Sequence, residues 1–334
     1  MRPILIMQGD TRYAFAAGRI RSLELRLLNK AGVTKLLEAN LEDFPRILAE
    51  FGYSFPSDIR SASDLEQLLT TEMWNLIKLM ENLSVDKNFP RLIRVRYDFL
   101  SAAFLLKEKA GGKIAELPPW GTISIQELRR IFEEERWDKL PEELAQGIKL
   151  AQKSFAESGS PSSIDSSLEG KYLVYLKQKL PNIPFIHSYY ELYFDLVNVI
   201  NFVRSKVWDK GLRFFATLYI DGGSFGFDFY KSIFELPHEQ LPARFIATEF
   251  GRPLGDAIQS ALQQNNFAPL QEFKDKSLLE YLSGAKYCPF GLELLFAYYI
   301  RKERELGVLR AIARGKIFGI PREIIKKALP YGYA

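Results

Sequence analysis

Apolar side chains recur at helical spacing along most of this chain. One predicted helix face carries Leu192, Leu196, Val199 and Val203, at positions i, i+4, i+7 and i+11. Residues at these intervals lie on one side of an α-helix. No run of alternating apolar and polar residues indicates a β-strand. The pattern therefore predicts an all-α protein.

Prolines and one capping pattern indicate where helices begin, because a first helical turn tolerates the missing N–H of proline. The prolines at such places are Pro45, Pro90, Pro141, Pro237, Pro289 and Pro321. Ser124 followed by Glu127 fits a capping box that opens another helix. Residues 154–170 are rich in Ser and Gly, so we expect a loop there, leading into a helix that begins near Ile164.

Three windows of the chain resemble one another, and they begin at residues 98, 195 and 305. Each window opens with an acid, carries apolar residues at the same offsets and ends with a lysine. The acids and lysines are Asp98 and Lys109, Asp195 and Lys206, and Glu305 and Lys316. An apolar triplet precedes each window: Phe44, Ile47 and Leu48; Leu128, Ile131 and Phe132; Tyr230, Ile233 and Phe234. This repetition predicts three helical units, of residues 1–119, 120–221 and 222–334.

Acid and lysine lie on one helix face in each window, about 16 Å apart along the axis, so they cannot pair within the helix. If buried, each needs a partner on a neighbouring element, because an unpaired buried charge is costly. Three interpretations remain open: solvated ends, polar contacts between helices, or direct contact with a binding partner. We expect Lys109, Lys206 and Lys316 to stabilise the repeats, with partner contact second.

Composition excludes several classes of protein. The 334 residues are 47% hydrophobic and 26% charged, as in ordinary globular proteins. The formal net charge of +4 is small for a protein that binds nucleic acid through its phosphates. Cys288 is the single cysteine, and we expect a small buried hydrophobe there. The apolar run at residues 294–300 is far shorter than the ~20 residues of a membrane-spanning helix, so no span is expected.

Residues with catalytic or metal-binding chemistry are scarce. The two histidines, His187 and His238, have no second His or Cys at metal-ligand spacing. No P-loop sequence is present, and the glycines at Gly222 and Gly223 lack the lysine that would follow in one. We therefore expect a turn at these glycines, and we predict no catalytic residue, no cofactor and no metal site.

Three segments, residues 13–28 (YAFAAGRIRSLELRLL), 164–172 and 298–327, stand out along the chain. They resemble motifs of the family of C subunits of V/A-type rotary ATPases, whose eukaryotic homologue is the d subunit. Residues 13–28 resemble its N-terminal signature, and residues 164–172 resemble its middle motif, with Glu169 in place of Asp. Residues 298–327 resemble the closing motif, although the family more usually has an Asn-Leu-Arg-type triplet where this chain has Gly307-Val308-Leu309-Arg310. The resemblance covers residues 13–330.

The resemblance implies an all-helical, funnel-shaped protein with three units around a pseudo-threefold axis. It implies a place on the cytoplasmic face of the membrane, between the proteolipid ring and the shaft made of the D and F subunits, with an indirect link to the nucleotide-binding A and B subunits. The function implied is mechanical coupling of ATP hydrolysis or synthesis to transport of H⁺ or Na⁺, without catalysis in the chain itself.

Other functions stay open from the residues alone. A helical repeat scaffold with unrelated partners would share the repeats and the scarcity of catalytic residues. A basic helical nucleic-acid binder would show affinity that falls steeply with salt. An enzyme with a site made only of carboxylates would need a pocket holding several perturbed acids.

Overall fold

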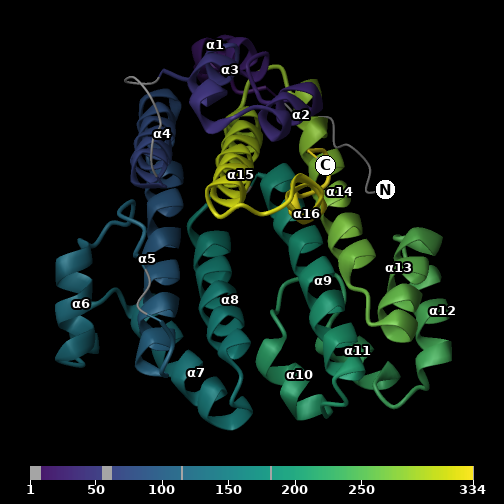
Figure 1. Cartoon of the computed structure of the whole chain (residues 1–334). Coiled ribbons are helices and arrows are strands. Elements are labelled where there is room, and N and C mark those ends of the chain that lie inside the picture. The colour runs from purple at the N-terminus through teal and green to yellow at the C-terminus, as the bar shows by residue number, and fades with distance from the viewer. Residues whose placement is uncertain (1–8, 55–61, 114–115, 181–182, 334) are drawn as a thin grey trace. The chain divides into compact units, whose positions relative to one another are not determined.

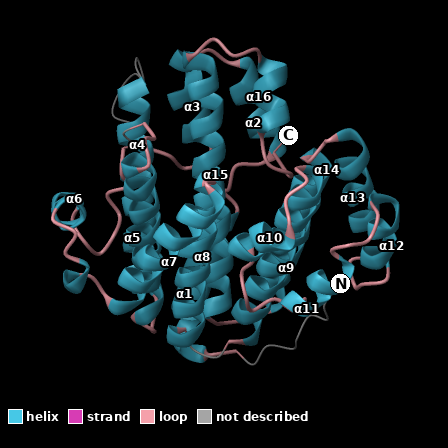
Figure 2. Cartoon of the chain, turned by 90° about the horizontal axis from the view of Figure 1, so that it is seen from below, coloured by secondary structure: helices cyan, strands magenta, loops and turns pink. Residues whose placement is uncertain are grey.

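The computed structural model describes residues 9–54, 62–113, 116–180 and 183–333 (Figure 1). Within these ranges every regular element is a helix, and Figure 2 shows them joined by loops, so the all-α prediction is confirmed. The α-helices are α1 (Ala14–Glu24), α2 (Lys30–Glu38), α3 (Phe44–Ala49), α4 (Ala62–Leu83), α5 (Asn88–Lys109), α6 (Ile125–Glu133), α7 (Glu142–Ser158), α8 (Pro161–Lys179), α9 (Pro184–Val207), α10 (Leu212–Leu218), α11 (Phe227–Ile233), α12 (Leu241–Ile246), α13 (Gly251–Gln264), α14 (Ala268–Ser283), α15 (Leu292–Ile317) and α16 (Arg322–Ala328). Single turns of 3-10 helix are η1 (Thr11–Tyr13), η2 (Leu41–Asp43), η3 (Trp137–Lys139), η4 (His238–Gln240) and η5 (Gly284–Tyr287).

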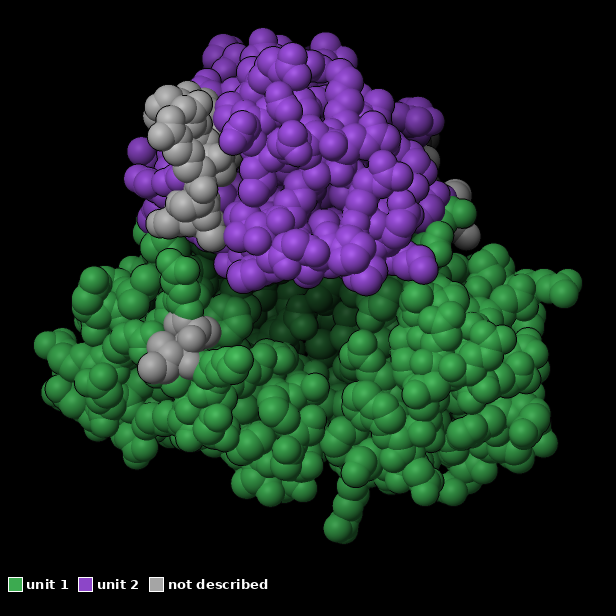
Figure 3. All heavy atoms as spheres, viewed as in Figure 1, with its two compact units in different colours: residues 1–5, 88–278 green, residues 6–87, 279–334 purple. Residues whose placement is uncertain are grey.

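The described chain divides into two compact units (Figure 3). One unit contains residues 88–278, and the other contains residues 9–87 together with residues 279–333. The second unit therefore joins the beginning of the described chain to its end. The predicted boundaries at residues 119 and 221 concern repeats within this arrangement, and they stay a prediction.

The unit of residues 88–278 is built around two long helices, α5 and α9. Helix α5 packs against α7 and α8, while α9 packs against α10 and α13. The α9 part has an aromatic core in which the rings of Phe215 and Tyr230 lie 5.5 Å and 5.4 Å from that of Phe202. Ring pairs at this separation stabilise a core beyond the area that they bury.

The other unit is built around α15, which packs against α1, α4 and α16. Its first turns, from Leu292 to Tyr299, are buried without interruption. Ile325 of α16 is buried and packs close to α15, since a Cβ added at Gly315 would lie 2.6 Å from its side chain. The glycine in α15 thus allows the short α16 to approach.

Most of the predicted helix starts are found, but Pro289 lies in a bend three residues before the first residue of α15. Ser124 is the N-cap of α6, and its hydroxyl accepts a hydrogen bond from the Glu127 N–H at 3.2 Å, as the capping pattern predicts. Pro45 lies in the first turn of α3, and Pro321 is the N-cap of α16. His187 lies in the first turn of α9.

The loop expected at residues 154–170 is wrong. Helix α7 continues to Ser158 and α8 begins at Pro161, so only Gly159 and Ser160 connect them. Gly159 has φ 65°, and its N–H bonds to the carbonyl of Phe155, which ends α7 abruptly. Burial of Ile164 in the packed α7–α8 pair outweighs the low helix propensity of the surrounding serines.

Candidate functional site

Asp98, the acid that opens the first window, is buried in α5. Its carboxylate accepts hydrogen bonds from the N–H groups of Thr122 (2.9 Å) and Ile123 (3.1 Å) and from the Thr122 hydroxyl (2.5 Å). Ile123 directly precedes Ser124, the N-cap of α6. Asp98 therefore holds the chain in place where α6 begins.

Asp195, the acid of the second window, makes the same kind of contact from α9. It is fully buried, and it accepts hydrogen bonds from the Phe225 N–H (3.0 Å) and the Ser224 hydroxyl (2.6 Å). Phe225 directly precedes Gly226, the N-cap of α11. The glycine-rich segment at residues 222–226 is thus a turn, held by a buried acid.

Glu305, the acid of the third window, is fully buried in α15 and is bound by a segment from the beginning of the chain. It accepts a hydrogen bond from the Leu28 N–H at 2.7 Å, and Leu28 directly precedes Asn29, the N-cap of α2. Lys302 Nζ donates to the same carboxylate at 2.7 Å. The hydroxyl of Tyr53 also donates to it. Glu305 therefore binds a lysine of its own helix and a tyrosine hydroxyl in addition to the backbone N–H of Leu28.

The three acids share one geometry, which we call the acid contact. In each, a buried carboxylate on a long helix accepts the N–H of the residue before the N-cap of a shorter helix: α6, α11 or α2. A glycine brings the chain close to the first two acids. A Cβ added at Gly121 would lie 2.2 Å from Asp98 Oδ1, and one at Gly223 would lie 2.3 Å from Asp195 Oδ1.

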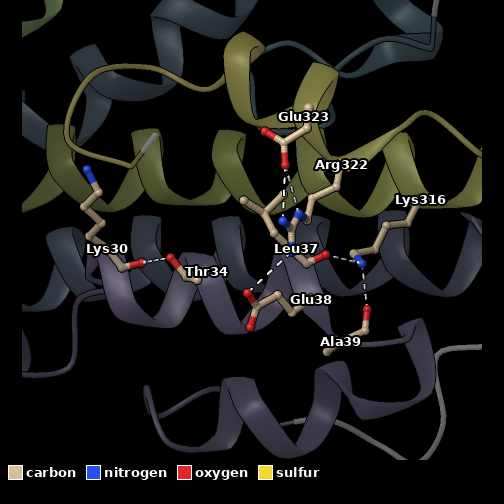
Figure 4. A network of polar contacts seen from close by, with 8 residues as sticks. All are labelled: Lys30, Thr34, Leu37, Glu38, Ala39, Lys316, Arg322 and Glu323. Carbon is tan, nitrogen blue, oxygen red and sulfur yellow. Dashed lines mark hydrogen bonds and ion pairs between the residues drawn. The ribbon is translucent and has the colours of Figure 1, made fainter.

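Two of the lysines bind the other end of the shorter helix, which we call the lysine contact. Lys206 Nζ donates to the Phe234 carbonyl, the C-cap of α11, at 2.7 Å. Lys316 Nζ donates to the carbonyls of Leu37 (2.8 Å) and Ala39 (2.6 Å) at the end of α2 (Figure 4). The last carbonyls of a helix lack partners within it and carry its negative dipole end, so a cation stabilises them.

Lys109, the lysine of the first window, differs. Its Nζ lies 3.0 Å from the carboxylate of Glu135, and the two side chains are 40% and 65% exposed. An ion pair this exposed contributes little to stability. In this window the preceding base, Lys107, forms a closer pair with Asp165 of α8.

Burial shifts the proton affinity of groups in these contacts, among them Asp98 and Tyr53. The pKa of Asp98 is raised, chiefly because burial disfavours its charged form, and the hydrogen bonds from Thr122 and Ile123 oppose that rise. The pKa of Tyr53 is raised well above its usual value by burial and by the charge of Glu305, so its hydroxyl stays protonated and donates to that carboxylate.

Each of the six predicted residues has a polar partner within the chain, and the structure shows partners that the sequence pattern missed. The helix bound by Glu305 and Lys316 is α2, whose buried residues Val33, Leu36 and Leu37 have the spacing of the triplets on α6 and α11. The triplet singled out at residues 44–48 is also buried, but it lies on α3. The i, i+3, i+4 spacing of apolar residues at 33–37 could have identified α2 from the sequence as the helix bound in the third window.

The three long helices also end in the same turn. The residue after each helix, Ala110, Trp208 or Phe318, donates its N–H four residues back, to Leu106, Arg204 or Arg314. Two residues further along, a second N–H bonds back to the carbonyl of Lys107, Ser205 or Gly315, each at 2.8 Å. Trp208 is 47% exposed and Phe318 is 74% exposed.

The described ranges give little support for a metal site or for a nucleophilic catalytic residue. They contain no group of three His, Cys, Asp or Glu side chains placed to hold a metal ion. Cys288 is buried, as expected, and burial with the nearby Glu293 raises the pKa of its thiol to about 12. Within the same ranges, no helix combines the length and the apolar character that crossing a bilayer requires.

Comparison with protein families gives one assignment for the chain as a whole. The family model described as ATP synthase (C/AC39) subunit matches residues 16–328. This chain belongs to that family. The matched range contains all three windows and all the residues that form the acid and lysine contacts.

Similar proteins match this chain over most of their length. The C subunit of the A-type ATP synthase of Methanocaldococcus jannaschii is 23% identical, over 95% of this chain and 86% of its own. Those of Thermococcus kodakarensis and Methanothermobacter thermautotrophicus are 22% and 23% identical, over 95% and 98% of this chain and 90% of each relative.

Proposed function

We propose that this chain is the central-stalk C subunit of a V/A-type rotary ATPase or ATP synthase. In this role it couples the shaft made of the D and F subunits to the membrane proteolipid ring, so that ATP hydrolysis or synthesis in the A and B subunits is linked to transport of H⁺ or Na⁺. It works peripherally, on the cytoplasmic side of the membrane, and carries out no catalysis itself. The observation that carries the proposal is the family match over residues 16–328, with C subunits of A-type ATP synthases aligned almost end to end.

The acid and lysine contacts support a mechanical role. A protein that couples two moving parts has to transmit force without deforming, and close-packed helices resist compression. Fixing both ends of α11 and α2 to a neighbouring long helix limits their sliding along it. The three predicted repeats around a pseudo-threefold axis belong to this proposal.

The test is an affinity purification of the tagged chain from native membranes in mild detergent, with quantification of every protein that copurifies. We expect nucleotide-binding subunits, shaft subunits and proteolipid at fixed ratios, with one copy of this chain per complex. Recovery from the soluble fraction without those partners would overturn the proposal and favour a helical scaffold of another kind.

Coupling itself needs a second measurement. Membranes from a strain lacking the chain should lose ATP-driven ion uptake, and adding back the purified chain should restore it. Ion uptake that is unchanged without the chain would contradict a coupling role even if the chain copurifies with the complex.

A further inference from the structure

The turn that ends α15 and the short helix α16 expose large apolar side chains. Phe318 is 74% exposed, Ile320 is 41% exposed and Ile324 is 57% exposed. The turn does not require a large residue at position 318, because the same turn at the end of α5 has Ala110 there. Burying this surface against something else would therefore be favourable.

The way α16 packs explains why Ile324 points outward. Its neighbour Ile325 is buried against Gly315 of α15, and this contact fixes the rotation of the short helix. Lys327 and Ala328 follow Ile324 by three and four residues, so they lie on the same side of α16, and both are exposed. We refer to the exposed side chains of Phe318, Ile320, Ile324, Lys326 and Lys327 as the α16 patch, in which Lys326 lies on the flank of α16 away from Ile324.

Positive charge is concentrated around this patch. Residues 314–327 contain five basic residues and one acid, an excess as large as the +4 of the whole chain. Two of these bases are paired, Arg314 with Glu66 and Arg322 with Glu38 and Glu323 (Figure 4). Lys326 and Lys327 are exposed, and within the described part of the chain neither has a carboxylate partner. These two lysines thus remain available to an anion.

We propose that the α16 patch binds the surface of an anionic lipid bilayer. Lysine is depleted in protein–protein interfaces, whereas it is common on the polar face of helices that lie on membranes, beside Phe and Leu. Its long stem covers apolar surface while its ammonium group reaches the phosphate of a headgroup. The patch contacts the bilayer peripherally, with Phe318 and Ile324 at the level of the headgroups.

Vesicle sedimentation with the purified full-length chain tests this directly. The probe is phosphatidylcholine vesicles with about one quarter phosphatidylglycerol, at about 50 mM salt, compared with phosphatidylcholine alone. We expect binding only to the anionic vesicles, and weaker binding as the salt concentration rises. Each lysine removed should weaken partitioning about five-fold.

Two variants locate the contact. Ile324→Ser combined with Lys326→Gln and Lys327→Gln should lower partitioning by at least about 25-fold. Lys149→Gln with Leu150→Ser, an exposed basic and apolar pair on α7, should leave it unchanged. No binding of the wild-type chain to anionic vesicles, or full binding by the triple variant, would overturn the proposal.

A fluorescence readout keeps the test independent of variants that fold poorly. Ile324→Trp should give a blue-shifted emission on anionic vesicles, and Leu150→Trp should give none. Binding of poly-glutamate that depends on the α16 patch, without vesicle binding, would overturn the proposal in favour of an acidic protein partner. Because the vesicles contain no other protein, a failure here is distinct from a failure of the proposed coupling function.

Discussion

Lys316 donates a hydrogen bond from its Nζ to the carbonyl of Leu37 at 2.8 Å, although the two residues are 279 positions apart in sequence. The contact joins the end of the long helix α15 to the end of α2 (Figure 4). Burial, followed by the nearby charge of Arg322, lowers the pKa of Lys316. Together with the acid contact at Glu305, it connects α2 to α15 at both ends.

The three lysines should differ in their effect on stability. Lys206→Met and Lys316→Met each leave helix-end carbonyls without their cation, and we expect each to lower the free energy of unfolding by about 1–3 kcal/mol. Lys109→Met removes only an exposed ion pair, so a loss below about 0.5 kcal/mol is expected. Urea unfolding of the three variants measures this order. Equal effects would show that the lysine contacts add nothing beyond a surface charge, and an unchanged melting temperature of Lys206→Met with lost shaft binding would assign that lysine to an interface.

Removal of a buried acid should be more harmful. Asp195→Ala leaves the Phe225 N–H and the Ser224 hydroxyl without their acceptor, and we expect a loss of about 2–4 kcal/mol. Asp165→Ala is a matched control, because that side chain is 47% exposed and loses only its pair with Lys107. Thermal unfolding followed by circular dichroism compares the two. A smaller loss for Asp195→Ala than for the control would contradict the structural role of the acid contact.

Two loop glycines should resist substitution for the same reason. Gly121→Ala or Gly223→Ala forces a Cβ into the carboxylate of Asp98 or Asp195, which we expect to cost about 1–3 kcal/mol. Gly307 in α15 has open space around its Cα, and Gly307→Ala should stabilise the protein by about 0.5–1 kcal/mol. Chemical unfolding gives both values. If Gly121→Ala and Gly223→Ala leave the free energy of unfolding unchanged, the turns can move away from their acids without destabilising the protein.

Glu293 should make stability depend on pH. Its pKa is raised above 4.5, chiefly by burial, so the folded chain holds this proton more tightly than the unfolded chain does. The resulting stabilisation is complete below the unfolded value and is lost as the pH rises through the folded value. Glu293→Gln cannot ionise, so it should be more stable than the wild type near neutral pH, and the difference should shrink as the pH falls towards about 5.

Urea unfolding of both proteins across this pH range measures the difference. Glu133→Gln, at an exposed position on α6, controls for the loss of one negative charge. A difference between Glu293→Gln and the wild type that stays constant with pH would show that burial does not perturb this carboxyl.

The sequence alone determined the all-α class and the charged positions that recur in the three windows. Apolar spacing predicted the all-α class because it follows from the 3.6-residue turn of a single helix. Ser124 as an N-cap and the acid and lysine positions of the three windows were also read locally. The short connection between α7 and α8 was missed, because packing of Ile164 overrode the local preference of the serines for a loop.

Only the tertiary structure decided what the charged residues bind. Asp98 and Asp195 find their donors within about thirty residues downstream, whereas Glu305 finds its donor at Leu28, near the other end of the chain. No local pattern encodes such a pairing, because it depends on which segments lie side by side after folding. The surroundings of each lysine then determine its contribution to stability. Lys109 forms an exposed ion pair, whereas Lys206 and Lys316, at the same position in their windows, bind the carbonyls at the end of a helix.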